Sequence, residues 1–264
     1  LRPARSISRA GNAMRIAAIL EYDGLNFSGW QRQKGARSVQ QCVEAALSKV
    51  ANEPIAVTVA GRTDAGVHAL AQVIHFDTSA ARGDHSWVRG AVSNLPDDVA
   101  LLWAGEVDAD FHARFSATGR RYHYVILNRL IRPTYLRGRV SWEYRPLDAA
   151  AMQQGAKHLI GTHDFSSFRA TECQAKNPVR ELRGLEVERH GEFVRIRVYA
   201  NAFLQHMVRN IAGVLMSIGA GERKPGWAKE VLEARDRTQG GVTAPPDGLY
   251  LTDIEYPEQF KIPR

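Results

Sequence analysis

The order of strand and helix patterns along the chain is the feature that most restricts its fold. Residues 14–22 form an apolar run typical of a buried strand, and Ser38 is suited to cap a helix that continues to residue 51. Strand patterns follow at 55–60 and 72–77, then a helix pattern at 87–95 and a strand pattern at 100–107. This β-α-β-β order, completed by α-β, is that of a ferredoxin-like unit.

The second half of the chain repeats the same kinds of element without repeating the sequence. Strands are predicted at 121–128, 181–189, 193–200 and 249–255, with a hairpin turn at His190-Gly191, and helices at 148–159, 203–219 and 227–235. We therefore expect an α+β fold of two ferredoxin-like lobes, residues 14–117 and 118–264, with joined, mainly antiparallel sheets. A cleft between the two lobes is the default place for an active site. Residues 1–13 are expected to be a flexible extension ahead of Met14.

Several classes of protein are not expected from the composition. The chain has no apolar run near 18 residues and no secretory signal, so we expect no membrane span and a cytoplasmic location. Its two cysteines, Cys42 and Cys173, cannot build a disulfide framework or a four-cysteine zinc site. The histidines have no companions at metal-ligand spacing, and neither a phosphate loop nor a dinucleotide fingerprint is present. We expect no metal and no cofactor.

Arginine and aromatic residues are concentrated in one stretch of this basic chain, whose formal net charge is +7. Residues 112–145 contain eight arginines, six aromatic residues and a single acid, Glu143. Basic groups neutralise phosphates and flat rings stack on exposed bases, so the stretch indicates nucleic-acid binding. A solvated strand and loop with core aromatics between them would produce the same composition, and both interpretations stay open at this point.

The segment 60–69, with the sequence AGRTDAGVHA, joins two predicted strands. Gly61 and Gly66 let the chain turn sharply, so the loop can present one side chain, Asp64. An aspartate next to a glycine is also an ordinary turn former, and the ten residues alone do not decide between the two interpretations.

The same segment resembles the signature of the tRNA pseudouridine synthase A family. Four further segments resemble the family's motifs in the same order, and they are EYDGLNFSGWQRQ at 21–33, FHARFSATGRRYHY at 111–124, NAFLQHMVRN at 201–210 and GLYL at 248–251. The resemblance covers about residues 14–256. Two features depart from the family pattern: Gln205 stands where a histidine is expected, and residues 1–13 have no counterpart.

The resemblance implies a pseudouridine synthase fold and three residues with roles. It gives Asp64 as the catalytic carboxylate, Arg209 as the arginine that pairs with it, and Tyr122 as the residue that stacks on the target base and could remove a proton. It also implies a cofactor-free homodimer that acts on the anticodon arm of tRNA, at uridines just 3′ of the anticodon. The candidate RNA-binding residues are Tyr122, Arg62, Arg114, Arg120 and Arg121.

These residue types suit the reaction, which detaches uracil N1 from the sugar, turns the base and rejoins it at C5. No oxidation occurs, a carboxylate can attack C6 or C1′ or assist departure of the base, and a nearby cation keeps that carboxylate ionised. The base must be flipped out at a cost of a few kcal/mol, which stacking worth roughly 1–3 kcal/mol per base offsets.

Other interpretations remain open from the sequence. Without the family resemblance, Arg209 is interpreted as a surface arginine on one helix face with Asn201 and Gln205, and Tyr122 as a core tyrosine. The whole protein could be a pseudouridine synthase for another RNA or a non-catalytic RNA-binding protein on the same scaffold. It could also be a metal-free hydrolase, which would need a second carboxylate such as Asp23 or Asp77 beside Asp64.

Overall fold

The computed structural model describes residues 13–263, and its strands form one mixed sheet through both halves of the molecule. Their order across the sheet is β4-β1-β3-β10-β5-β9-β8-β7, with β2 added to β3 and β6 to β5. All pairs are antiparallel except β10 with β3 and β5 with β6. The protein is thus α+β with a large, mostly antiparallel sheet, as the element order predicts. Almost all of the predicted extension, residues 1–12, lies outside the described residues.

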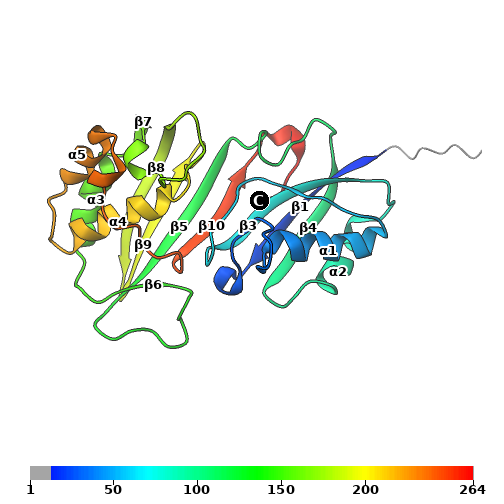
Figure 1. The fold of residues 1–264 in the computed structure, drawn as a ribbon, viewed down its shortest axis with the longest axis horizontal. Coiled ribbons are helices and arrows are strands. Elements are labelled where there is room, and N and C mark those ends of the chain that lie inside the picture. Colours follow the sequence, from blue (N-terminus) through cyan, green and yellow to red (C-terminus); the bar gives the residue numbers. More distant parts are fainter. Residues whose placement is uncertain (1–12, 264) are drawn as a thin grey trace, which may run out of the picture.

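The first half contains the strands β1 to β4 and two helices. The elements are β1 (Met14–Tyr22), the short helix η1 (Gly24–Asn26), α1 (Val39–Ala51), β2 (Thr58–Val59), β3 (His68–Thr78), α2 (Asp84–Val92) and β4 (Val99–Val107). Ser38 caps α1 as expected, because its side chain accepts a hydrogen bond from the Gln41 N–H. Helices α1 and α2 lie side by side at this end of the molecule (Figure 1).

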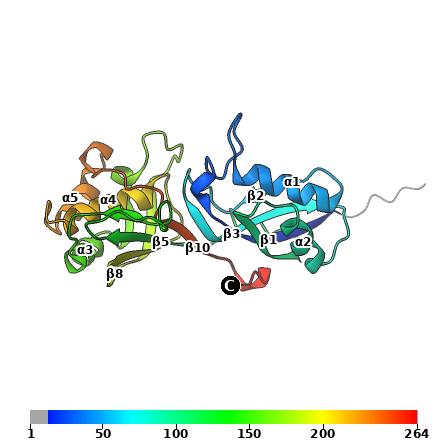
Figure 2. The same ribbon diagram turned by 90° about the horizontal axis from the view of Figure 1, so that it is seen from below.

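The second half contains the remaining strands and three helices. The elements are β5 (Gly119–Asn128), β6 (Ser141–Glu143), α3 (Ala149–Lys157), β7 (Gly161–Asp164), η2 (Ser166–Phe168), β8 (Val179–His190), β9 (Phe193–Ala200), α4 (Met207–Gly219), α5 (Trp227–Ala234), η3 (Arg237–Gln239), β10 (Leu249–Glu255) and η4 (Glu258–Phe260). Asp148 caps α3, and Gly191 makes the β8–β9 turn with a φ of 59°. Helices α3, α4 and α5 gather at the end opposite α1 and α2 (Figure 2).

Strand β10 joins the two halves, although it comes last in the chain. It pairs in parallel with β3 through Tyr250 and Leu251 and in antiparallel fashion with β5 along the whole strand. After β10 the chain returns to the first half, where the rings of Tyr256 and Phe260 lie 5.1 and 5.2 Å from that of Phe111. The proposed division into lobes at residues 117 and 118 stays a prediction, since the final segment contacts both sides of it.

Some predicted boundaries were wrong in instructive ways. The predicted helix 203–219 begins only at Met207, because His206 has a left-handed backbone with φ of 61°. Leu204 keeps the helical spacing but is buried in the loop before the helix. The predicted strand 55–60 is only the two-residue β2, whereas β3 extends four residues further toward the signature loop than its predicted start at 72. The short strands β6 and β7 were not predicted. No helix among residues 13–263 is long and apolar enough to cross a membrane.

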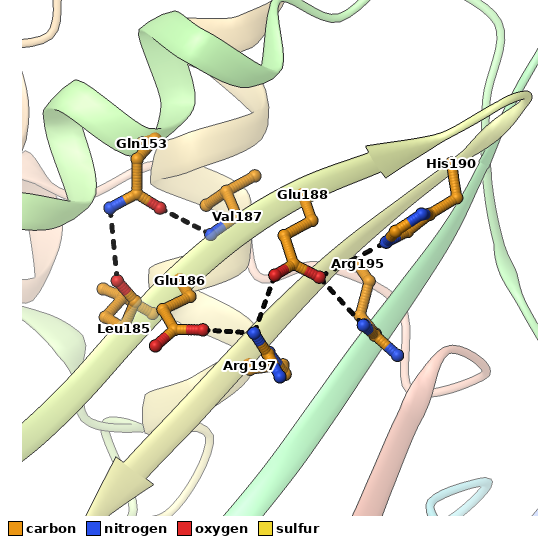
Figure 3. A network of polar contacts seen from close by, with 8 residues as sticks. All are labelled: Gln153, Leu185, Glu186, Val187, Glu188, His190, Arg195 and Arg197. Atoms are coloured by element: carbon orange, nitrogen blue, oxygen red, sulfur yellow. Dashed lines mark hydrogen bonds and ion pairs between the residues drawn. The ribbon is translucent and has the colours of Figure 1, made fainter.

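Ion pairs cover one face of the hairpin formed by β8 and β9. Figure 3 shows Glu186 and Glu188 of β8 pointing toward Arg195 and Arg197 of β9, with Glu188 2.8 Å from Arg195 and 2.7 Å from Arg197. The bond from Arg195 is the main reason that the pKa of Glu188 falls from 4.5 to about 2. This contribution to stability is therefore present above pH 4.5 and is lost as the pH falls toward 2.

The far edge of β8 is closed by a side chain instead of a strand. Strand β7 pairs with β8 only as far as Leu182, so the edge beyond it has no strand neighbour among residues 13–263. The Gln153 amide of α3 fills this position, because it accepts from the Val187 N–H at 2.6 Å and donates to the Leu185 carbonyl at 3.4 Å (Figure 3). Covering the edge in this way prevents it from pairing with another chain.

Candidate active site

Asp64 lies in the loop between β2 and β3, and that loop is fixed mainly through its backbone. The Trp30 N–H donates to the Thr63 carbonyl at 3.0 Å, and the Gly66 N–H donates to the Phe27 carbonyl at 3.3 Å. Gly66 has a φ of 78°, in the left-handed region that favours glycine, so the chain can turn immediately after Asp64. The loop thus presents the Asp64 side chain on a rigid support.

A buried polar network supports the same loop from below. The hydroxyl of Tyr22 lies 2.8 Å from Thr63 Oγ1, and Gln72 Nε2 donates to the Tyr22 hydroxyl at 3.2 Å and to the Gly61 carbonyl at 2.8 Å. Burial raises the pKa of Tyr22 to about 12, so its hydroxyl stays protonated and available for these bonds. Residues on both sides of Asp64 are therefore attached to the core of the first half.

The carboxylate of Asp64 meets two basic side chains from the second half. Arg209 Nη1 and His206 Nε2 each lie 3.3 Å from Asp64 Oδ2. The side chain of Asp64 is 29% exposed and that of Arg209 only 14%, so solvent weakens this contact less than it weakens an ion pair on the surface. His206 is the N-cap residue of α4 and Arg209 lies in its first turn, and the N-terminal end of a helix favours a nearby negative charge.

Arg209 is itself held by the segment that precedes β10. Its Nε donates to the Ala244 carbonyl at 2.8 Å, and the Ala244 N–H donates back to the Arg209 carbonyl at 3.1 Å. Asn201 and Gln205 precede α4 and so do not share a helix face with Arg209, contrary to the sequence-based alternative. The interpretation of Arg209 as a surface arginine without an acid partner was also wrong, because it contacts Asp64.

Gly213 of α4 lets the segment that precedes β10 approach the helix closely. A Cβ on Gly213, one turn after Arg209, would lie 1.9 Å from the Val242 carbonyl oxygen. Thr243 Oγ1 donates to Asn210 Oδ1 at 2.7 Å beside this contact. The backbone of residues 242–244 therefore packs directly on the helix that carries Arg209.

Tyr122 lies on β5, where it pairs with Leu251 of β10 and Val198 of β9. It is 9% exposed, and its ring meets that of Phe203 edge-on at 5.1 Å. Burial raises its pKa well above the usual range, and the negative charge of Asp64 raises it further. The hydroxyl is thus neutral at physiological pH.

Two of the four candidate RNA-binding arginines already have partners within the protein. Arg120 donates to the carbonyls of Asn201 at 2.8 Å, Arg114 at 2.9 Å and Ala60 at 3.2 Å. It therefore ties the start of the Asp64 loop to the segments before β5 and α4. Adjacent residues of a strand point to opposite faces, so Arg121 points away from the face of Tyr122. There Arg121 pairs with Glu255 at 2.6 Å and lies 3.9 Å from the centre of the Tyr199 ring.

The other two, Arg62 and Arg114, are exposed near the Asp64 loop. Neither forms an ion pair with a carboxylate among residues 13–263. The guanidinium of Arg114 lies 5.6 Å from the centre of the Phe115 ring, which is 76% exposed. An exposed ring beside free cations is suited to contact a base and its phosphate.

The candidate second carboxylates are used elsewhere. Asp23 pairs with Arg139 at 2.6 Å, and Asp77 pairs with Arg15 at 2.8 Å. In the described part of the chain, no group of three or more His, Cys, Asp or Glu residues is arranged to hold a metal ion. The residue that the sequence analysis missed is His206, because it has no companion at metal-ligand spacing. The only feature of the sequence that points to His206 as a site residue is its position three residues before Arg209.

Comparisons with known proteins show the family of the chain and several similar proteins. Residues 18–116 and 156–257 match the family described as tRNA pseudouridine synthase, and the chain belongs to that family. Proteins called tRNA pseudouridine synthase A are similar to it: one from Nitrosococcus oceani is 60% identical over 95% of this chain and 97% of its own length. One from Coxiella burnetii is 59% identical over 95% and 96%, and one from Pseudomonas aeruginosa is 55% identical over 99% and 92%. The family resemblance drawn from five sequence segments is confirmed.

One solved structure resembles the protein, but the similarity is too weak to support the family assignment. A Cbf5-Nop10-Gar1 complex aligns with a TM-score of 0.30 and 13% identity, over 76% of this chain and 54% of that one.

Substitution of Gly213 tests how closely the segment before β10 must approach α4. We expect Gly213→Ala to lower the free energy of unfolding by about 1–3 kcal/mol in urea denaturation, because its Cβ would overlap the Val242 carbonyl. Gly226→Ala is the matched control, since a Cβ there meets nothing within 4 Å. Equal stability of the two variants would contradict the close packing described.

Proposed function

We propose that the protein isomerises uridine to pseudouridine in tRNA, with Asp64 as the catalytic carboxylate and without a cofactor. The observation that carries the proposal is the contact between Asp64, in the family's signature loop, and Arg209, from the opposite half of the molecule. A partly exposed carboxylate with a fixed cationic partner is a suitable nucleophile for a sugar or base carbon. The three relatives called tRNA pseudouridine synthase A, which match nearly all of the chain, support the choice of tRNA.

The residues around Asp64 match the steps of the reaction. The ionised carboxylate attacks C1′ of the sugar as the bond to N1 breaks, or adds to C6 of the base before that bond breaks, or assists departure of the base. After the base turns, C5 bonds to C1′, any bond to Asp64 breaks and restores the carboxylate, and C5 loses its proton. Arg209 keeps the negative charge in place. Tyr122 offers a buried ring for stacking and a protonated hydroxyl for moving the C5 proton through hydrogen bonding. Its high pKa makes the hydroxyl a better relay than a base.

We further propose that Arg62 and Arg114, with Phe115, contact the RNA, and that the target lies in the anticodon arm. Both arginines are exposed and free of carboxylate partners among the described residues. Arg120 supports RNA binding by holding their two segments together, since its donors are taken by the carbonyls of Ala60 and Arg114. The anticodon arm rests on the family resemblance and on the ease with which a loop uridine is flipped out.

A homodimer and a cytoplasmic location complete the proposal. The apolar side chains of Leu130, Ile131 and Tyr144 are 74%, 67% and 58% exposed, and Trp142 beside them donates to the Arg129 carbonyl at 2.9 Å. A second copy of the chain would cover such a surface.

Sedimentation velocity tests this interface. We expect the wild type to sediment as a dimer and Ile131→Asp to sediment as a monomer. A monomeric wild type would refute the interface.

The central experiment replaces Asp64 with Asn, which keeps the size and polarity of the side chain but removes its charge. We expect Asp64→Asn to fold and to bind tRNA at least as tightly as the wild type, because a negative charge near phosphates is gone. It should form no pseudouridine, because an amide is a poor nucleophile. The assay is release of tritium from C5-labelled uridine in a tRNA anticodon arm, with chelator present.

Asp77→Asn is the matched control. Asp77 lies near the end of β3 that is farther from the Asp64 loop, and it pairs there with Arg15 of β1. It should retain the wild-type rate. Substantial tritium release by Asp64→Asn would overturn the catalytic assignment, and a chelator-sensitive wild type would overturn the cofactor-free reaction.

The RNA-contact proposal predicts a change in salt dependence. Each phosphate contact contributes about 0.7–0.9 to the slope of log affinity against log salt concentration, so Arg62→Gln with Arg114→Gln should lower the slope by roughly 1.4–1.8. Arg82→Gln, an exposed arginine in the segment before α2, should leave the slope unchanged. An unchanged slope in the double variant, measured by titration of fluorescent tRNA, would show that neither arginine contacts phosphate.

A further inference from the structure

Two basic side chains, Arg209 and His206, lie against one oxygen of the Asp64 carboxylate. Arg209 Nη1 and His206 Nε2 both lie 3.3 Å from Oδ2. Within residues 13–263, no hydrogen bond or ion pair reaches Oδ1.

The backbone at His206 is arranged to bring its side chain to Asp64. His206 has φ of 61° and ψ of 2°, a left-handed conformation that is uncommon outside glycine, although asparagine, aspartate and histidine adopt it more often than other residues. Its carbonyl accepts the first bond of α4, from the Asn210 N–H at 2.9 Å. Its side chain makes no hydrogen bond that caps the helix and is directed to Asp64 instead. An uncommon backbone conformation held at an active site points to a function for the side chain.

The neighbouring Gln205, where the family pattern has a histidine, does not take this place. Its side chain is exposed, and its backbone carbonyl accepts a hydrogen bond from the Ala170 N–H at 2.9 Å. The imidazole that reaches Asp64 is that of His206.

We propose that His206 is a positioning residue for the reacting carboxylate. With Arg209 it holds Oδ2 from a second direction, so the carboxylate cannot rotate freely about its χ2 bond and Oδ1 faces the substrate. Arg209 alone would fix one oxygen at a single point, whereas two donors on that oxygen fix its plane as well. This inference rests on the proposed role of Asp64 and adds to it the residue that sets the carboxylate's orientation.

The test uses His206→Gly, because glycine adopts the same backbone without strain and removes only the imidazole. We expect the single-turnover rate of tritium release to fall by at least about tenfold, while the Kd for tRNA stays within about twofold of the wild type. Added imidazole should restore part of the rate, because it can occupy the space left by the side chain and donate to Oδ2. Asparagine also adopts the left-handed backbone, so the single-turnover rate of His206→Asn should lie between those of the wild type and His206→Gly.

Asn52→Gly is the matched control, since Asn52 also has a left-handed backbone, with φ of 57°, at the end of α1. It should keep the wild-type rate and show no response to imidazole. A wild-type rate in His206→Gly would overturn the proposal. A loss of rate that imidazole does not restore would also overturn it and assign His206 to anchoring α4, and a parallel loss of tRNA affinity would make it an RNA contact. An active wild type with an inactive Asp64→Asn in the same assay keeps these outcomes separate from failure of the proposed function.

Discussion

The contact between Asp64 and Arg209 is the interaction on which the organisation of the site depends. The two residues are far apart in the sequence and belong to opposite halves, yet their charged atoms are 3.3 Å apart. Each has its own support: the Tyr22 network fixes the loop of Asp64, and the Ala244 backbone fixes the guanidinium of Arg209. The pair therefore joins two rigid bodies, and small changes in how the halves meet would act directly on the carboxylate.

Strand β10 makes this meeting possible. It is the last strand in the chain but lies between β3 of the first half and β5 of the second, so one continuous sheet sets the distance between the halves. The segment before β10 carries Ala244, which holds Arg209, and Pro246, which would lie 3.0 Å from a Cβ on Gly66 in the Asp64 loop. The same segment of the chain therefore joins the two halves of the sheet and contacts both Arg209 and the Asp64 loop.

Most of the strands and helices could be predicted from the sequence because they depend on local pattern. The contacts of the site could not, because they depend on how distant segments meet. Strands such as 193–200 alternate strictly, and helix α1 has a cap and an apolar stripe, so local pattern was enough. The first turn expected for α4 was wrong because Leu204 keeps helical spacing while His206 adopts a left-handed backbone. The partners of Arg120 are backbone carbonyls of distant segments, which no side-chain pattern reveals. The contact of His206 with Asp64 likewise depends on how the halves meet.

A double-mutant cycle on Asp64 and Arg209 tests the central claim most directly. Asp64→Ala, Arg209→Met and the double variant would be unfolded in urea, and the bond between Arg209 and Ala244 cancels in the cycle because it is lost from both backgrounds. The account predicts a favourable coupling energy of about 0.5–2 kcal/mol, as expected for a partly buried contact between two supported groups. Additivity of the two single substitutions to within about 0.3 kcal/mol would contradict it, because the halves would then be held together without this pair.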